Sequence, residues 1–488
     1  MHGILTTFFM STIVKISYTC ENSTTIEIPE DFIFSASTSA YQIEGAWNED
    51  GKSPSVWDTY THNHPEKIAD HSNGDIAADS YHFYKKDVEA LKSIGFKQYR
   101  FSISWPRVII NGTKINQKGI DYYNNLINEL ISNGIQPAVT MYHWDIPQYL
   151  QDLGGFANPI ISQYFEFYAN VLFTNFGDRV KIWMTFNEPL TNCIGEYGEG
   201  RSGASVRAPG VGEYLCGHHV LISHANVYHL YKEKFYKKQK GEIGISLNLR
   251  YNYPKDEVIT KDFVMRSLDL VNGWFLNPIF SKNGGYPEEL VKIFEQKSIE
   301  EGIWSRLPIM SEELKKKIKG TADFLGVNYY TSRYVAPITH GENLNKFDYD
   351  TGISYSMDKN WYKGITAWAY SVPDGLHDLL IWIREKYENP KIMITENGWT
   401  DSGEMNDFDR IKYIKDHLAA VLKAKEENCN IIGYTVWSLI DNFEWSEGYT
   451  VHLGIFAVNM SSPEKERIPK RSARFLKDLI ANKKFEIC

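Results

Sequence analysis

The sequence predicts an α/β protein built on a single (β/α)8 TIM barrel. Eight short runs rich in β-branched and aromatic residues recur along the chain, and helical patterns separate most of them. Such alternation indicates parallel strands, and eight of them favour closure into a barrel. The alternative is a doubly wound open sheet. It is disfavoured because no glycine-rich dinucleotide fingerprint follows any of the runs.

The elements follow in a regular order. The predicted strands span residues 32–39, 98–104, 136–142, 181–186, 242–249, 323–329, 391–395 and 431–438. Helical periodicity, with apolar side chains three or four residues apart, marks residues 77–93, 119–132, 160–175, 214–237, 374–387, 409–425 and 471–481. Residues 251–322 and 331–372 are too long for simple connections, and we expect them to form insertions over the C-terminal face of the strands.

The composition excludes several classes of protein. The chain has 488 residues, of which 43% are hydrophobic and 23% charged, which is ordinary for a globular protein. No apolar run approaches the ~20 residues of a membrane span. The formal net charge of −9 argues against a nucleic-acid binder. We therefore expect neither a membrane nor a nucleic acid as partner. A monomer and a homodimer are equally compatible with the sequence.

The N-terminus is predicted to be a signal peptide. Residues 4–14 are mostly apolar and small residues follow, although a clear positive charge is missing, and a cytosolic leader is the alternative. We place the signal peptide at 1–20 and a single domain at 21–488, and expect a secreted protein. Three Asn-x-Ser/Thr sequons, at Asn22, Asn111 and Asn459, suggest a glycoprotein.

The five cysteines show neither a disulfide scaffold nor metal-finger spacing. Cys193 and Cys216 are either one bridge or two buried thiols. We expect no metal and no organic cofactor.

Polar and aromatic residues cluster where the predicted strands end, which is where barrel enzymes place their active sites. Glu188 follows the fourth strand and Glu396 follows the seventh, each next to an asparagine. A single glutamate there would be read as a cap of the following turn, but two on strands across a barrel can face one pocket. Two carboxylates roughly 5–5.5 Å apart are the machinery of a retaining glycosidase, whereas an inverting enzyme spaces them roughly 6.5–9.5 Å apart.

Two further strand-end residues support this interpretation. Arg100 can hold a nucleophilic carboxylate ionised, or form a structural ion pair through the same contact. His143 has no second histidine at zinc spacing, and the adjacent Trp144 and Asp145 favour recognition of hydroxyl groups over a purely structural role.

Taken together, the strand-end motifs resemble those of family-one glycoside hydrolases, the β-glucosidases and their relatives. The similarity runs from about residue 28 to about residue 480. The segment around Cys193 and Cys216 looks most like animal members, insect ones in particular. The motifs are SAYQIEG at 39–45, RFSISW at 100–105, HWD at 143–145, TFNEP at 185–189, ITENG at 394–398, WSL at 437–439 and DNFEW at 441–445.

The resemblance implies a role for each residue. Glu188 matches the general acid/base and Glu396 the nucleophile of a retaining mechanism. Support for these two and contact with the substrate are implied for nine further residues. Arg100 and Tyr330 match the partners of the nucleophile, Asn187 a ligand of the sugar 2-hydroxyl, Gln42, His143, Glu444 and Trp445 the hydroxyl-binding set, Trp437 the platform under the sugar, and Trp368 an aglycone-facing tryptophan.

The resemblance narrows the substrate to small β-glycosides, most simply terminal β-D-glucosides. Glu444 would repel a 6-phosphate, which disfavours phosphoglycosides. Thioglucosidases of the myrosinase type, which cleave glucosinolates, are the alternative, because some insect members keep both glutamates. The sulfate of their aglycone would favour basic residues at the mouth. By position, the candidates are Arg201, Arg207, Arg250 and Arg333. A remote alternative is a non-catalytic sugar-binding barrel, although such proteins typically lose one catalytic glutamate.

Three positions depart from the family pattern. Phe456 and Asn459 replace the more usual tyrosine and aspartate, and Asp374 stands where insect relatives often have tryptophan. These departures bear on the choice of substrate and leave the expected reaction unchanged.

Overall fold

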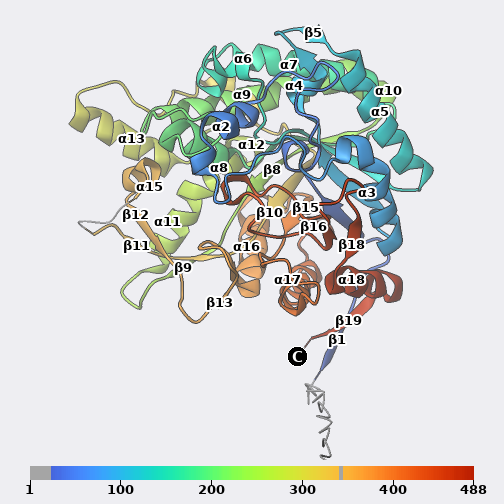
Figure 1. The fold of residues 1–488 in the computed structure, drawn as a ribbon. Helices are drawn as coiled ribbons and strands as arrows, with labels where there is room; N and C mark the ends of the chain where they lie inside the picture. Colours follow the sequence, from blue (N-terminus) through green and yellow to red (C-terminus); the bar gives the residue numbers. More distant parts are fainter. Residues whose placement is uncertain (1–22, 340–343, 488) are drawn as a thin grey trace, which may run out of the picture.

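The computed structural model describes residues 23–339 and 344–487. Eight parallel strands close into a barrel in the order β10-β15-β16-β2-β3-β6-β7-β8 (Figure 1). Their bounds are β2 Ile33–Ser37, β3 Gln98–Ser102, β6 Gln136–Tyr142, β7 Ile182–Asn187, β8 Glu242–Asn248, β10 Phe324–Asn328, β15 Ile392–Asn397 and β16 Ile431–Trp437. All eight predicted strands are confirmed, with ends shifted by no more than two residues.

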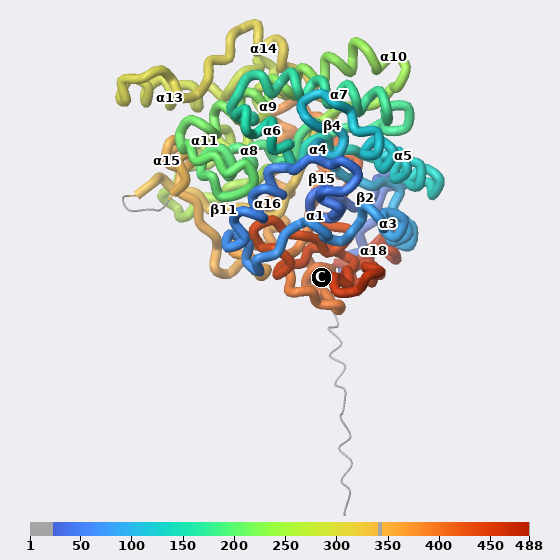
Figure 2. The backbone as a smooth tube through the Cα atoms, turned by 45° about the horizontal axis from the view of Figure 1, so that its top comes forward, coloured from blue at the N-terminus to red at the C-terminus, as the bar shows by residue number. Residues whose placement is uncertain are grey.

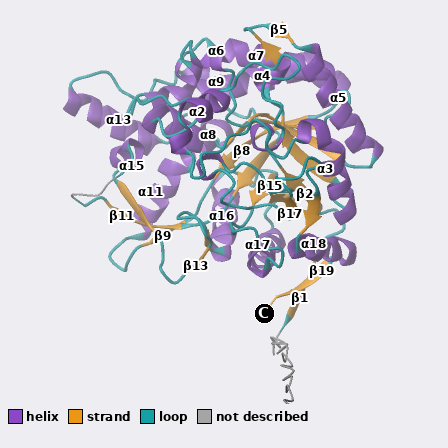
Figure 3. Ribbon diagram, in the orientation of Figure 1, coloured by secondary structure: helices purple, strands orange, loops and turns teal. Residues whose placement is uncertain are grey.

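Helices surround the strands on the outside (Figure 3). The seven helical patterns correspond to α3 Ser80–Ile94, α5 Gln117–Ser132, α7 Ile161–Phe176, α9 Gly212–Leu230, α16 Pro373–Lys386, α17 Phe408–Glu426 and α18 Arg471–Asn482. The pattern predicted for 214–237 ends earlier as an α-helix, because the backbone widens into a π-helical segment, η4 (Tyr231–Phe235), before α10 (Tyr236–Gln239).

The first long segment, 251–322, is only partly an insertion over the strand ends. Its helices are α11 Lys261–Val271, α12 Gly273–Phe280, α13 Glu288–Glu301 and α14 Glu312–Ile318. Both α12 and α14 pack against α9, so they belong to the outer helical layer, which corrects the expectation for this part.

The second long segment, 331–372, joins the first through a small sheet. Its order is β12-β11-β9, with bounds β9 Asn252–Pro254, β11 Arg333–Pro337 and β12 Ile353–Ser356. Helix α15 (Lys346–Thr351) contacts α13 at one edge of the molecule (Figure 2).

The remaining elements are short. They are α1 Ala40–Ile43, α2 Val56–Asn63, α4 Trp105–Val108, α6 Gln148–Gln151, α8 Pro189–Asn192, the π-helical η3 Cys193–Glu199, three 3-10 turns (η1 Pro65–Lys67, η2 Gly155–Ala157 and η5 Trp445–Glu447), and the hairpin strands β4 Ile109–Ile110, β5 Lys114–Ile115, β13 Tyr362–Lys363, β14 Tyr370–Ser371, β17 Phe456–Val458 and β18 Arg467–Pro469. Within the described ranges, no helix combines the length and apolarity needed to cross a membrane.

The interior of the barrel changes character along its axis. Near the starts of the strands it is filled by an apolar cluster of Ala138, Met184, Phe324 and Met393. Toward the strand ends the inward side chains are polar, with Arg100, Asn187 and Glu396 all less than 4% exposed. The apolar cluster fills the barrel beneath these polar side chains, so the charged groups among them are shielded from water.

One disulfide bond and one pair of short strands link separate parts of the chain. Cys193 and Cys216 form a disulfide with a Cα–Cα distance of 5.5 Å, which decides between the two alternatives left open by the sequence. Strand β1 (Thr24–Glu27) pairs antiparallel with β19 (Lys484–Ile487), so the two ends of the described chain lie together. The predicted signal peptide, 1–20, and Asn22 lie outside the described residues.

Candidate active site

A cavity of about 830 Å³ opens where the barrel strands end. The strand-end residues predicted from the sequence gather there, together with Thr331, Arg333 and Trp368 of the second long segment, 331–372. Of the predicted site residues, those lining the cavity are His143, Asn187, Glu188, Tyr330, Trp368, Glu396, Trp437, Glu444 and Trp445. Arg100 and Gln42 lie directly behind this wall and contact lining residues.

Glu396 is held by two donors on opposite oxygens. Arg100 donates from Nη1 to Oε1 at 2.7 Å, and the Tyr330 hydroxyl donates to Oε2 at 2.7 Å. A buried guanidinium and a hydroxyl both stabilise the charged carboxylate. Arg100 is itself fixed by the hydroxyls of Ser37 and Thr140. Both carboxylate oxygens are therefore bound, which keeps the group in one orientation.

The chain just after β15 passes very close to the end of β16. A Cβ placed on Gly398 would lie 2.0 Å from the carbonyl oxygen of Trp437. Only glycine fits this approach. The contact keeps the end of the Glu396 strand directly beside Trp437.

Asparagine side chains connect the two glutamates. Asn187 Oδ1 accepts from Arg100 Nη2 at 2.7 Å and from Asn328 Nδ2 at 3.0 Å. Asn328 Nδ2 also donates to Glu188 Oε1 at 2.9 Å. The parallel register of β10 and β15 sets Asn328 opposite Glu396. A continuous chain of hydrogen bonds thus runs from Glu396 through Arg100, Asn187 and Asn328 to Glu188.

Glu188 occupies a strained position and a dry environment. Its backbone is left-handed, with φ 47° and ψ 58°, at the turn between β7 and α8. Such a conformation is uncommon outside glycine and recurs at functional sites. Its other oxygen accepts from Thr191 at 3.1 Å and Asn248 at 3.4 Å. Burial, and secondly the charge of Glu396, raise the pKa of Glu188 to about 7.

A second carboxyl group, Glu444, lies farther along the same wall. Burial, followed by the charge of Glu396, raises the pKa of Glu444 to about 8. Gln42 is fully buried, and its amide nitrogen donates to Glu444 Oε2 at 3.1 Å. Gln42 therefore positions Glu444 in this structure.

Aromatic rings form the rest of this wall. The His143 ring stacks with Trp437 at a centroid distance of 5.6 Å and with Trp445 at 6.0 Å. Burial and the nearby Arg100 lower the pKa of His143 well below its usual value, so the imidazole is neutral. Its Nε2 accepts from Asn187 Nδ2 at 3.1 Å. Flat apolar faces next to oriented polar groups suit a sugar ring.

The mouth of the cavity contains Trp368 and all four arginines singled out in the sequence. Trp368 lies edge-on to Tyr330, with centroids 5.5 Å apart. Arg201 is exposed and forms an ion pair with Glu199. Arg250 and Arg333 are half-buried, and neither forms an ion pair with a described carboxylate. Arg250 lies over the Tyr355 ring, while Arg333 donates to the Ser332 carbonyl oxygen.

Some residues that contact Glu188 were not predicted as site residues. Asn328, Thr191 and Asn248 hold Glu188, but of the asparagines near it only Asn187 was given a role in the predicted site. Asn328 and Asn248 are the last residues of β10 and β8, so their place at strand ends was a usable signal. Thr191 lies in the short α8 and carries no such signal.

The barrel and the paired glutamates at the ends of β7 and β15 define a glycosidase type of site. The chain matches the model described as "Glycosyl hydrolase family 1" over residues 24–485. It belongs to this family, which is a family of retaining glycosidases, and it is an enzyme of the β-glucosidase type. The resemblance noted in the sequence is thereby confirmed.

Relatives named as myrosinases and as β-glucosidases are similar over nearly their whole length. "Myrosinase 1" of Brevicoryne brassicae is 47% identical over 466 residues, covering 94% of this chain and 99% of that protein. "Beta-glucosidase 24" of Oryza sativa subsp. japonica is 41% identical over 485 residues, covering 93% and 94%. The solved structure "Aphid myrosinase" superposes with a TM-score of 0.90 at 47% identity, covering 93% and 99%.

Proposed function

We propose that the enzyme hydrolyses terminal β-D-glucosides, with Glu396 as nucleophile and Glu188 as general acid/base. The contrast between the two carboxyl groups carries this proposal. Glu396 faces a guanidinium and a hydroxyl that stabilise its charge, whereas burial raises the pKa of Glu188 to about 7. A retaining glycosidase needs one ionised carboxylate and one protonated carboxylic acid.

The reaction proceeds in two displacements. A carboxylate oxygen of Glu396 forms a bond to the anomeric carbon while the bond to the leaving oxygen breaks, and Glu188 gives its proton to that oxygen. Glu188, now ionised, then takes a proton from water as the water oxygen attacks the anomeric carbon. Glu396 leaves as a carboxylate, Glu188 is again protonated, and glucose is released with its configuration retained.

The remaining wall residues would bind the substrate. Trp437 would lie under the sugar ring, with Asn187, His143, Glu444 and Trp445 around its hydroxyl groups. Trp368 would face the aglycone.

Initial rates on p-nitrophenyl β-D-glucoside test the proposal. Wild-type enzyme should release nitrophenol, and Glu396→Gln should reduce turnover by at least about 10⁴-fold, because the covalent step is lost. Proton NMR of early product should show the β-anomer. Normal turnover by Glu396→Gln would overturn the assignment of the nucleophile. An α-anomer as first product would contradict the retaining mechanism.

A second candidate activity is the hydrolysis of glucosinolates, which are S-glucosides with a sulfated aglycone. The observation that favours it is the pair Arg250 and Arg333 at the cavity mouth. Burial, and secondly the charge of Arg250, lower the pKa of Arg333 to about 9. The charge of Arg250 acts on Asp348, but neither arginine forms an ion pair with a described carboxylate. Two neighbouring cations of this kind are stabilised by a bound anion, and guanidinium groups suit an oxyanion such as sulfate.

Paired rates on p-nitrophenyl β-D-glucoside and allyl glucosinolate separate the two activities. If the enzyme is a thioglucosidase, Arg333→Met and Arg250→Met should lower kcat/KM for the glucosinolate by at least about tenfold and leave the nitrophenyl glucoside within twofold. Arg201→Met is the matched control, since Glu199 already neutralises Arg201. Release of nitrophenol without glucosinolate turnover would exclude this activity.

We also propose that the protein is secreted and glycosylated. The Cys193–Cys216 disulfide supports passage through an oxidising compartment. Asn111 is exposed in the turn between β4 and β5, as an acceptor asparagine must be. Protein secreted by insect cells should lose mass on treatment with an N-glycosidase, and Thr113→Ala should remove that part of the loss that comes from Asn111. Retention of the protein inside the cells would contradict the proposal.

A further inference from the structure

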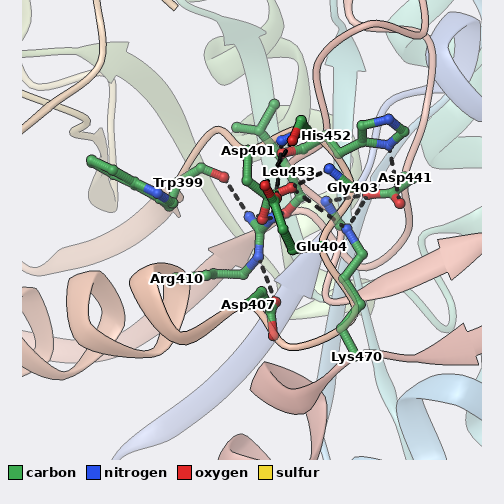
Figure 4. A network of polar contacts seen from close by, with 12 residues as sticks. Trp399, Asp401, Gly403, Glu404, Asp407, Arg410, Asp441, His452, Leu453 and Lys470 are labelled. Atoms are coloured by element: carbon green, nitrogen blue, oxygen red, sulfur yellow. Dashed lines mark hydrogen bonds and ion pairs between the residues drawn. The ribbon is translucent and has the colours of Figure 1, made fainter. Parts of the chain in front are cut away.

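A largely buried cluster of ionisable side chains lies behind the cavity wall, between the segments that follow β15 and β16. It comprises Arg410, Asp401, Asp407, Lys470, Asp441 and His452, and we call it the Arg410 cluster (Figure 4). None of these six residues lines the cavity. The proposed reaction uses none of them.

Arg410 is the centre of this cluster. It lies in the first turn of α17, and its side chain is 1% exposed. Nε donates to Asp407 Oδ2 at 2.9 Å, Nη1 to the carbonyl oxygens of Trp399 and Leu453, and Nη2 to Asp401 Oδ2. One guanidinium therefore joins the segment after β15 and the start of α17 to Leu453, which lies 43 residues farther along the chain. Figure 4 shows these contacts converging on Arg410.

Two of the joined segments carry or support site residues. Trp399 follows Glu396 by three residues along the same strand end. Leu453 lines the cavity and packs with Trp437, Val451 and Tyr330. The Leu453 carbonyl oxygen accepts from Arg410 at 3.0 Å and from the Ser438 backbone N–H at 3.0 Å. Arg410 thus fixes the wall with Trp437 relative to the strand that presents Glu396.

The other members of the cluster hold its two sides. Asp407 accepts from the Ser472 backbone N–H at 2.8 Å, which ties the start of α17 to α18. Lys470, fully buried, lies 2.9 Å from Asp441 and 4.0 Å from Asp401. Asp441 also accepts from the Gly454 N–H at 3.0 Å, and His452 Nδ1 lies 3.2 Å from it. The aspartates that contact Arg410 are thus themselves held in place.

We propose that Arg410 is a positioning residue for the first displacement. It sets the distance between the Glu396 carboxylate and the sugar-binding wall formed by Trp437 and Leu453. This inference rests on the proposed function. A shift of about 1 Å in that distance would cost roughly 100-fold in rate, because the attacking oxygen and the anomeric carbon must be held in line.

Arg410→Lys keeps the positive charge but loses the planar fork that reaches both segments at once. We expect kcat/KM for p-nitrophenyl β-D-glucoside to fall about 10- to 100-fold. The dissociation constant of glucono-1,5-lactone, read from tryptophan fluorescence, should rise by a similar factor, since this ligand needs the wall in the same place.

Arg467→Lys is the matched control. Arg467 is equally buried, donates to Asp87 at 2.8 Å and to Ser80, and does not contact the cavity. Its replacement should lower the melting temperature while leaving kcat, KM and lactone binding within twofold. If Arg410→Lys behaves like Arg467→Lys, Arg410 is merely structural and the inference is wrong.

Asp407→Asn provides a milder second variant in case Arg410→Lys fails to fold. It weakens the contact between Arg410 and the start of α17, together with the contacts of Asp407 to Ser472, while Arg410 keeps its bonds to Trp399, Asp401 and Leu453. It should give a smaller change in the same direction. Unchanged kinetics and lactone binding would again overturn the inference. Absence of glucoside hydrolysis by the wild type would contradict the proposed function, whereas lactone binding would still report on Arg410.

Discussion

Hydrolysis should slow as the pH rises through about 7, because Glu188 must carry a proton to release the aglycone. Burial, and secondly the charge on Glu396, raise the pKa of Glu188 from 4.5 to about 7. That difference corresponds to about 3 kcal/mol against the carboxylate form. At pH 8 roughly one molecule in ten retains the proton. For an alkyl β-glucoside, whose leaving group needs protonation, kcat/KM should therefore be about tenfold below its plateau.

The assay is the pH dependence of kcat/KM, which reports ionisations of the free enzyme. Glu188→Gln should lack the decline near pH 7 because the ionising carboxyl group is gone. Its rate can be measured on 2,4-dinitrophenyl β-D-glucoside, whose leaving group needs no acid. Glu444, with a pKa of about 8, would add a decline about one pH unit higher. Asn328→Leu removes a donor that stabilises the charged form of Glu188, so it should move the decline to higher pH. A decline below pH 6, or one that persists near pH 7 in Glu188→Gln, would refute the reasoning.

Three further predictions follow from contacts described above. The pKa of Glu188 is raised on folding, so the native state gains stability at low pH and loses it as the pH rises through about 7. At pH 8 Glu188→Gln should therefore be up to about 3 kcal/mol more stable than wild type and should melt at a higher temperature. At pH 4 the two proteins should melt at the same temperature. Equal melting temperatures at pH 8 would contradict this prediction. Tyr330→Phe removes the 2.7 Å hydrogen bond to Glu396 and should lower kcat for p-nitrophenyl β-D-glucoside about 10- to 100-fold without unfolding the protein, as checked by circular dichroism. Replacing Cys193 and Cys216 together by serine should cost about 3 kcal/mol, given their separation of 23 residues, and lower the melting temperature measured at one scan rate; an unchanged melting temperature would show that the bridge contributes no stability.

The barrel could be predicted because its signals are local. Each strand is a short apolar run that ends in polar residues, and the structure shifts those ends by two residues at most. The segment 251–322 was harder to interpret. Its amphipathic helices look alike in sequence whether they cover the strand ends or pack against α9, and only tertiary contacts separate α12 and α14 from the rest.

The site shows the same division between local and long-range information. Glu188 and Glu396 could be proposed as the paired carboxyl groups because each stands at the end of a predicted strand. The links between them could not, because Asn328 reaches Asn187 and Glu188 across 141 and 140 residues of chain. The disulfide was undecided for a related reason. Spacing alone does not show whether two cysteines face each other. That depends on how η3 packs against α9.

The pairing of β1 with β19 has a practical consequence. Both strands lie just outside the barrel at the end where β2 begins, so they are on the side opposite Glu188 and Glu396. Residue 24 pairs with residue 487 there. A short linker could join these two ends, and new ends could be opened in an exposed surface turn such as residues 111–113. The same geometry would let the enzyme be tethered to a solid support through either end with its cavity facing the solution.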